Sequence, residues 1–300
     1  MSSIYCSIIF LVTLSALAGC KSPSASIQSN SSSLQPSPSV SPSIEMPEMT
    51  ENFYVKSDSL TYSDFEVIKL HKEVRLEQTR GLTEVSYAIL RRNGRKVATF
   101  DGVYCGYGNA TDFGLLSFLG GDTQQFIISQ TIPRGGRHWI VNVSPEYRVL
   151  FDSREFGVGR EEIVIVDIDG DGIREIFLEL TAFYGFENIS SAETPLPEII
   201  FKYDARERKY LPANRIFHDY ALRGVQQEID DLSRLEGEAH FSRVLDITLR
   251  YIFAGKEQEA WAFFDRECRM KNRDEIKTRI LSELRNEPVY KFISGQHATQ

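Results

Sequence analysis

One acidic run carries the strongest chemical signal in this 300-residue sequence. Its carboxylates stand at the first, third, fifth and ninth positions, as Asp167, Asp169, Asp171 and Glu175. Because Ca²⁺ takes six to eight oxygen ligands, alternate carboxylates in one loop can converge on this ion. The backbone carbonyl of Ile173 supplies a further oxygen at the seventh position, and Gly172 permits the sharp bend before it. The run therefore predicts a Ca²⁺ site, with the ion in a structural role.

The residues around this run decide which kind of calcium loop it is. An EF-hand is excluded, because its twelfth position would be Leu178 and both flanks have strand-like sequences. From Glu162 to Leu180 the sequence resembles the calcium loop of the FG-GAP or VCBS repeats of integrin-type β-propellers. The resemblance implies a strand–loop–strand unit with Asp167, Asp169, Asp171 and Glu175 as the side-chain ligands. The alternative is a tight acidic hairpin that binds no metal.

A second cluster combines cationic and aromatic side chains near two glycines. Arg134, Arg137 and His138 precede Trp139 in the run from Pro133 to Trp139. We expect a Gly-Gly turn here, which either binds an anion or a sugar or is a solvated turn from which Trp139 returns to the core. The sequence contains no zincin, nucleophile-elbow or Walker motif and no zinc-spaced cysteine pair, so we assign no catalytic residue. The alternative function on this cluster is a cell-envelope enzyme or a glycan-binding protein.

The N-terminus predicts export. An uncharged apolar stretch from Ile4 to Ala18 is short for a membrane span but suits the core of a signal peptide. It ends in Leu17-Ala18-Gly19-Cys20, which resembles the lipobox of bacterial lipoproteins. The resemblance implies a signal peptide over residues 1–19 and a lipid anchor on Cys20. Lys21, in place of an aspartate, permits sorting to the outer membrane, and the inner membrane stays open.

The segment after the lipobox favours a tether. Residues 20–50 are rich in serine and proline and poor in apolar side chains, a composition that is typical of a disordered linker. The whole sequence has 42% hydrophobic and 25% charged residues, as in a globular protein, and a net charge of −8. This charge argues against a nucleic-acid partner. The predicted partners are the membrane, through the lipid, and a protein or glycan of the envelope.

The cysteines of the folded part leave two alternatives. Cys105 and Cys268 remain after the processed N-terminus, and in an oxidising compartment they can form a disulfide. Buried free thiols are also common, so both states stay open.

The folded part has two regions with different sequence patterns, one typical of strands and one typical of helices, which together predict an α+β protein. Over residues 51–212, short β-branched and aromatic runs alternate with turn residues, which predicts an antiparallel β-meander, as a sandwich or an incomplete propeller. The clearest hairpin turns at Asn93-Gly94, between Tyr87–Leu90 and Val97–Phe100. Six further strands are predicted, at residues 126–128, 139–141, 149–151, 163–166, 176–178 and 199–201.

Residues 213–300 predict a helical subdomain of about four helices, because apolar residues recur there at helical intervals. The spacing of Gly255, Ala260 and Phe264 resembles the turn and second helix of a tetratricopeptide repeat. A helical hairpin that caps the β part is favoured over a peptide-binding repeat, because a solenoid needs about three units. As an alternative, this tail is a protein-interaction module with an exposed apolar groove around Trp261 and Phe264.

Overall fold

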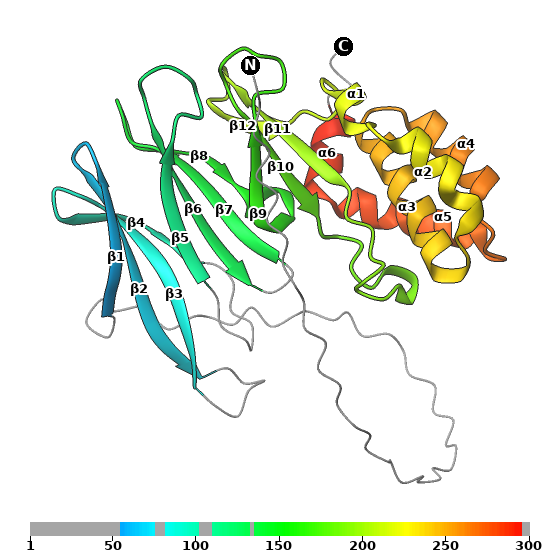
Figure 1. Cartoon of the computed structure of the whole chain (residues 1–300), viewed down its shortest axis with the longest axis horizontal. Coiled ribbons are helices and arrows are strands. Elements are labelled where there is room, and N and C mark those ends of the chain that lie inside the picture. Colours follow the sequence, from blue (N-terminus) through cyan, green and yellow to red (C-terminus); the bar gives the residue numbers. More distant parts are fainter. Residues whose placement is uncertain (1–54, 76–81, 102–109, 133–134, 296–300) are drawn as a thin grey trace, which may run out of the picture. The chain divides into compact units, whose positions relative to one another are not determined.

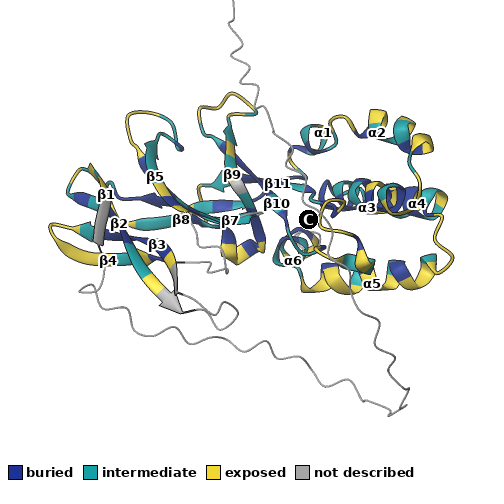
Figure 2. Ribbon diagram, turned by 60° about the horizontal axis from the view of Figure 1, so that its bottom comes forward, coloured by how far each residue is buried: buried dark blue, intermediate teal, exposed yellow. Residues whose placement is uncertain are grey.

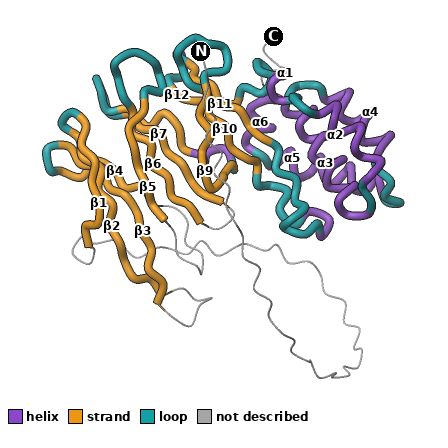
Figure 3. Tube along the Cα trace, in the orientation of Figure 1, coloured by secondary structure: helices purple, strands orange, loops and turns teal. Residues whose placement is uncertain are grey.

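A computed structural model of the chain describes residues 55–75, 82–101, 110–132 and 135–295. Strands fill the first part of this region and helices the second (Figure 3). The predictions of a signal peptide over residues 1–19 and of a tether over residues 20–50 lie outside the described residues. Among the helices that the structure describes, none is long and apolar enough to cross a membrane.

Twelve described strands form three antiparallel sheets of four strands each. Sheet A contains β1 (Val55–Tyr62), β2 (Phe65–Arg75), β3 (Leu82–Arg92) and β4 (Arg95–Phe100). Sheet B contains β5 (Ala110–Leu116), β6 (Gln125–Ile132), β7 (Gly135–Asn142) and β8 (Arg148–Asp152). Sheet C contains β9 (Val158–Val166), β10 (Glu175–Leu180), β11 (Glu198–Asp204) and β12 (Lys209–Pro212). Each sheet is a meander, since sequential strands are neighbours, and this confirms the predicted architecture.

The hairpin of β3 and β4 forms as the sequence predicts. Asn93 and Gly94 have φ angles of 50° and 78°, which a two-residue type I′ turn requires. All six further strands that the sequence predicts are also present, within β6 to β11.

Sheet B lies between the other two sheets, because its strands are apolar on both faces. On β7, Trp139 faces sheet A, where its ring centroid lies 5.7 Å from that of Phe100. The next residue, Ile140, points to the opposite face and belongs to the core shared with sheet C. In that core the rings of Phe151 and Phe201 are 4.9 Å apart. Alternation with a period of two thus lets one strand contribute to two cores. Most residues of β7 and β10 are buried (Figure 2).

The helices follow sheet C directly in the chain (Figure 1). They are α1 (His218–Ala221), α2 (Val225–Asp231), α3 (Gly237–Phe253), α4 (Glu257–Glu267), α5 (Arg273–Asn286) and α6 (Pro288–Gly295), with short 3₁₀ segments at Ser153–Phe156, Phe186–Asn188 and Leu232–Arg234. The described residues contain six α-helices, more than the about four that the sequence predicts, because the short helices α1 and α2 precede α3 to α6.

The helical part shares its core with the sheets. Phe253, Phe264 and Ile280 are fully buried in the same cluster as Phe201 of β11. Residues from Thr50 to Gln300 accordingly form one compact unit. The change from strands to helices, between Pro212 and His218, is thus a change of secondary structure within that unit.

The predicted hairpin of α3 and α4 is present. Gly255 lies in the turn between them with a φ of 80°, and Ala260 is fully buried where the two helices approach. A positive φ favours glycine, and a small side chain lets the helix axes come close.

Candidate metal site in the loop between β9 and β10

The acidic run forms the loop between β9 and β10, as the sequence predicts. Val166 at the end of β9 pairs with Glu175 at the start of β10, so the loop spans residues 167–174. Gly170 and Gly172 have φ angles of 73° and 84°, which let the chain reverse twice within a few residues. The flanks are therefore antiparallel strands, as in the strand–loop–strand unit that the resemblance implies.

The loop is held in shape by its own carboxylates. Asp167 accepts hydrogen bonds from the backbone N–H groups of Gly170 and Gly172, at 2.8 and 3.0 Å. The N–H of Ile173 donates to Asp171 at 2.7 Å. The N–H of Ile168 donates to Glu175 Oε2 at 2.8 Å. These hydrogen bonds from the backbone N–H groups of the loop thus fix the rotamers of the acidic side chains.

Three of the predicted ligands converge. One carboxylate oxygen from each of Asp167, Asp169 and Glu175 lies within 4.8 Å of the other two. Glu175 is fully buried, whereas Asp167 and Asp169 are exposed. Oxygen ligands of this kind suit hard divalent cations, so this group can hold a metal ion. Asp171 stands outside this closest group, and the N–H of Ile173 bonds to Asp171.

A lysine that sequence analysis missed lies among these acids. Lys202 on β11 places its Nζ 2.7 Å from Asp169, 2.8 Å from Asp171 and 3.2 Å from Glu175. Burial opposes the charge on Lys202, but the hydrogen bonds to the three carboxylates outweigh it and raise its pKa. The hydrogen bond from Lys202 in turn lowers the pKa of Asp171. An ammonium group therefore neutralises part of the charge that would attract a metal ion.

Neighbouring segments fix the end of the loop. The N–H of Arg174 donates to the carbonyl of Phe118 at 2.8 Å, and its Nε donates to the carbonyl of Ser117 at 3.2 Å. The hydroxyl of Tyr210 on β12 donates to the carbonyl of Arg174 at 3.0 Å. Gly120 packs so closely that an added Cβ would lie 2.8 Å from the carbonyl oxygen of Gly172. The loop is thus braced by sheets B and C.

The second predicted cluster has a different environment from the one expected. Gly135 and Gly136 begin strand β7 and do not form a turn, which corrects the prediction. The lack of a side chain on Gly136 admits the β9 backbone, since an added Cβ would clash with the carbonyl oxygen of Arg160. Arg134 lies outside the described residues. Arg137 is half-buried, and burial lowers its pKa.

His138 is a core residue. Its side chain is fully buried, with Nδ1 2.9 Å from the hydroxyl of Ser129 and Nε2 2.9 Å from the carbonyl of Arg160. Burial lowers its pKa, so the neutral ring is favoured. Both ring nitrogens are thus engaged within the fold, and the ring is not offered to a ligand.

The remaining predicted residues lie in the helical part. Cys268 is buried directly after α4. Its predicted partner Cys105 lies outside the described residues, so the pairing stays a prediction. Phe264 is fully buried, and Trp261 is half-buried with its ring 5.0 Å from the ammonium of Lys277. These two aromatic side chains therefore do not form the exposed apolar groove expected of an interaction module.

No protein-family model, curated protein or solved structure compared with this chain matches it. The function therefore has to be argued from the site and from the N-terminal sequence.

Proposed function

We propose that this chain is a lipid-anchored protein of the bacterial cell envelope with a non-catalytic, binding or structural role, and that its β9–β10 loop holds Ca²⁺. The anchor rests on the lipobox ending in Cys20 and on the serine- and proline-rich tether that follows it. A lipid at one end of a flexible segment gives the folded part reach from the membrane surface.

The convergence of Asp167, Asp169 and Glu175 carries the calcium part of the proposal. Their oxygens lie within 4.8 Å of one another on a loop whose backbone N–H groups donate hydrogen bonds to all three carboxylates. Concentrated negative charge in one loop repels itself, and a divalent ion relieves this repulsion. An ion that binds the folded loop but not the unfolded chain stabilises the fold, so a structural role follows.

Calorimetry tests the calcium site. The chain from residue 20 onward with Cys20→Ser keeps every described residue, and its melting temperature is measured with millimolar calcium and with EGTA. We expect a calcium-dependent rise of a few degrees that is lost in an Asp167→Asn/Asp169→Asn variant. Asp122→Asn, an exposed carboxylate in the loop between β5 and β6, is the matched control and should keep the rise. The absence of any shift in the parent chain would reject the site.

A separate experiment tests the anchor. Globomycin blocks the signal peptidase of lipoproteins, so the full chain should accumulate as a larger precursor in treated cells. Cys20→Ala should leave the chain without lipid. A precursor of unchanged size under globomycin would contradict the proposed anchoring.

A further inference from the structure

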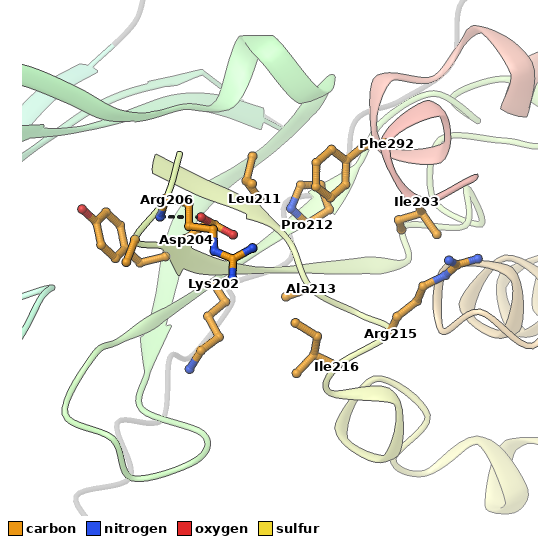
Figure 4. Close-up of a pocket in the computed structure, with 12 residues that line it drawn as sticks. Lys202, Asp204, Arg206, Leu211, Pro212, Ala213, Arg215, Ile216, Phe292 and Ile293 are labelled. Atoms are coloured by element: carbon orange, nitrogen blue, oxygen red, sulfur yellow. Dashed lines mark hydrogen bonds between the residues drawn. The ribbon is translucent and has the colours of Figure 1, made fainter. Parts of the chain in front are cut away.

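A cavity of about 380 Å³ lies between sheet C and the helices (Figure 4). The β11–β12 hairpin forms one side, the segment after β12 forms the floor, and α6 contributes Phe292 and Ile293. A volume of this size is within the range of small-molecule sites. The cavity adjoins the β9–β10 loop through Lys202, but no member of the acidic triad lines it.

Two of the lining arginines have no described partner. Arg206 and Arg215 make no ion pair or side-chain hydrogen bond with any residue that the structure describes, whereas twelve other arginines have described ion pairs, among them Arg223, Arg243 and Arg250. The carboxylate of Glu257 is near enough for its charge to favour the cation of Arg215, but no ion pair joins the two side chains. Among the described residues, the cavity thus carries two guanidinium groups that no ion pair holds.

The acid beside these arginines is engaged in a turn. Asp204 accepts hydrogen bonds from the backbone N–H groups of Arg206 and Glu207, at 2.8 and 2.9 Å. Lys202, which also contributes to the lining, is held by the acidic loop, and in Figure 4 its side chain runs away from Arg215. The two arginines therefore dominate the charge of the cavity.

Arg215 is the stronger of the two for binding an anion. Its Nε is buried and has no hydrogen-bond partner among the described residues. Its side chain packs on Gly255, where an added Cβ would lie 3.0 Å from both its Cγ and its Nε. Burial lowers the pKa of Arg215, because the fold removes water from the guanidinium and does not supply enough polar partners in place of that water. A buried donor of this kind lacks an acceptor, and a carboxylate supplies one.

The rest of the lining is apolar. Leu211, Pro212 and Phe292 face the cavity together with Ile216, which is 68% exposed and is the most exposed large hydrophobic residue that the structure describes. In Figure 4, Arg206 and Arg215 lie on opposite sides of the view, with Pro212 and Ile216 between them. A ligand that covers this surface removes apolar area from water while its charged group meets a guanidinium.

We propose that this cavity binds an amphiphilic carboxylate, a monoanion with an apolar chain about as long as that of octanoate. Arg215 pairs with the carboxylate, and the chain lies over Leu211, Ile216 and Phe292. Arg206 attracts the anion without a defined contact. The inference does not depend on the proposed calcium site, because the carboxylate is held by Arg215, and Lys202, the lining residue that contacts the acidic loop, has no part in it.

Isothermal titration with octanoate tests this proposal on the chain from residue 20 onward with Cys20→Ser. A ligand of this size should bind with a dissociation constant of roughly 0.1–1 mM. Octanamide has the same chain without the charge and should bind at least about tenfold more weakly. Arg215→Met keeps the packing of the aliphatic stem on Gly255 and should weaken octanoate binding about tenfold.

Two variants and one control separate the contributions. Arg206→Met should weaken binding by about threefold, because an exposed charge acts through solvent. Ile216→Ser removes exposed apolar surface without opening the core, and it should weaken octanoate and octanamide alike. Arg95→Met, on the exposed strand β4, should bind as the parent does.

Three results would overturn the proposal. These are no heat of binding up to about 10 mM octanoate, equal affinities for octanoate and octanamide, and an Arg215→Met affinity equal to that of the parent. The circular dichroism and melting temperature of each variant show whether it is folded, so that a folding defect is not read as lost binding.

Discussion

Lys202→Met is the change that most directly tests how the acidic loop works. Methionine keeps an apolar side chain in place of the stem of Lys202, but it removes the ammonium, which contacts the carboxylates and lies 5.5 Å from the ring centroid of Phe217. If calcium and the ammonium compete for the same oxygens, this variant should bind Ca²⁺ more tightly than the parent. The reason is that the ion no longer has to break three ion pairs and meets one more unit of negative charge.

The contacts of Lys202 set the size of the effect. The side chains of Asp169 and Asp171 are each 39% exposed, so these pairs contribute about 0.2–1 kcal/mol each after screening. Glu175 is 0% exposed, and a charge-assisted bond to a buried carboxylate contributes about 1.5–3 kcal/mol. The total is about 3 kcal/mol, which corresponds to roughly a hundredfold in affinity. Extracellular calcium modules bind at ~10⁻⁴ to 10⁻³ M, so Lys202→Met should bind at ~10⁻⁶ to 10⁻⁵ M.

Titration calorimetry measures this affinity, and thermal melting gives a second readout. Without calcium the variant should melt below the parent, because Glu175 loses a partner inside the protein. With saturating calcium the difference should largely disappear, because the tighter binding offsets the loss of the ion pairs. Lys209→Met on the neighbouring strand β12 removes a partly exposed lysine that lies 3.7 Å from Glu155, and it should change neither the affinity nor the response of the melting temperature to calcium.

The two reasons for a negative result can be told apart. If Lys202→Met and the parent bind calcium with equal affinity, the loop is a metal site but the ammonium does not compete, and our interpretation of Lys202 is refuted. If neither protein binds calcium, the proposed metal site itself fails, and Lys202 is the permanent counter-ion of an acidic hairpin.

Two further predictions concern stability. Burial raises the pKa of Asp246 from 3.8 to about 6, so the folded state takes up a proton that the unfolded chain does not, and stability should fall as the pH rises from about 4 to about 6. Because Asp246 is still partly exposed, Asp246→Asn should raise the free energy of unfolding at pH 7 by about 1–2 kcal/mol and flatten this pH dependence. Asp122→Asn is the control and should do neither. Equal urea-denaturation profiles for Asp246→Asn and the parent would contradict the argument. Gly255→Ala should lower the free energy of unfolding by about 1–2 kcal/mol because of its positive φ, and further because of the clash with Arg215. Gly94 has a φ of 78° and nothing within 4 Å of an added Cβ, so Gly94→Ala measures the backbone strain alone. Equal melting temperatures for these two glycine variants would show that the side chain of Arg215 moves away from the added methyl group without a loss of stability.

The parts of the fold that could be predicted are those with a strong local signal. Asn93-Gly94 specifies its turn through two positive φ angles, and the β-branched runs of β9 and β11 specify strands without help from distant residues. Strand β5 is not recognised, since Gly114 and polar residues interrupt its alternation. Gly135 and Gly136 look like a turn because glycine most often marks one. They are instead in a strand, where the β9 backbone packs against Gly136, which is a contact between distant segments.

The same distinction applies to the candidate site. The ligands Asp167, Asp169 and Glu175 are found from the sequence because they lie within nine residues, and the geometry of one loop brings them together. Lys202 is missed because its contact depends on the register between β10 and β11, where Ile176 pairs with Phe201. One step further along this register brings Lys202 opposite Glu175, and opposite charges in such a pair attract. A charged residue that ends the apolar run of β11 is thus the available signal, and only the strand pairing shows which acids it meets.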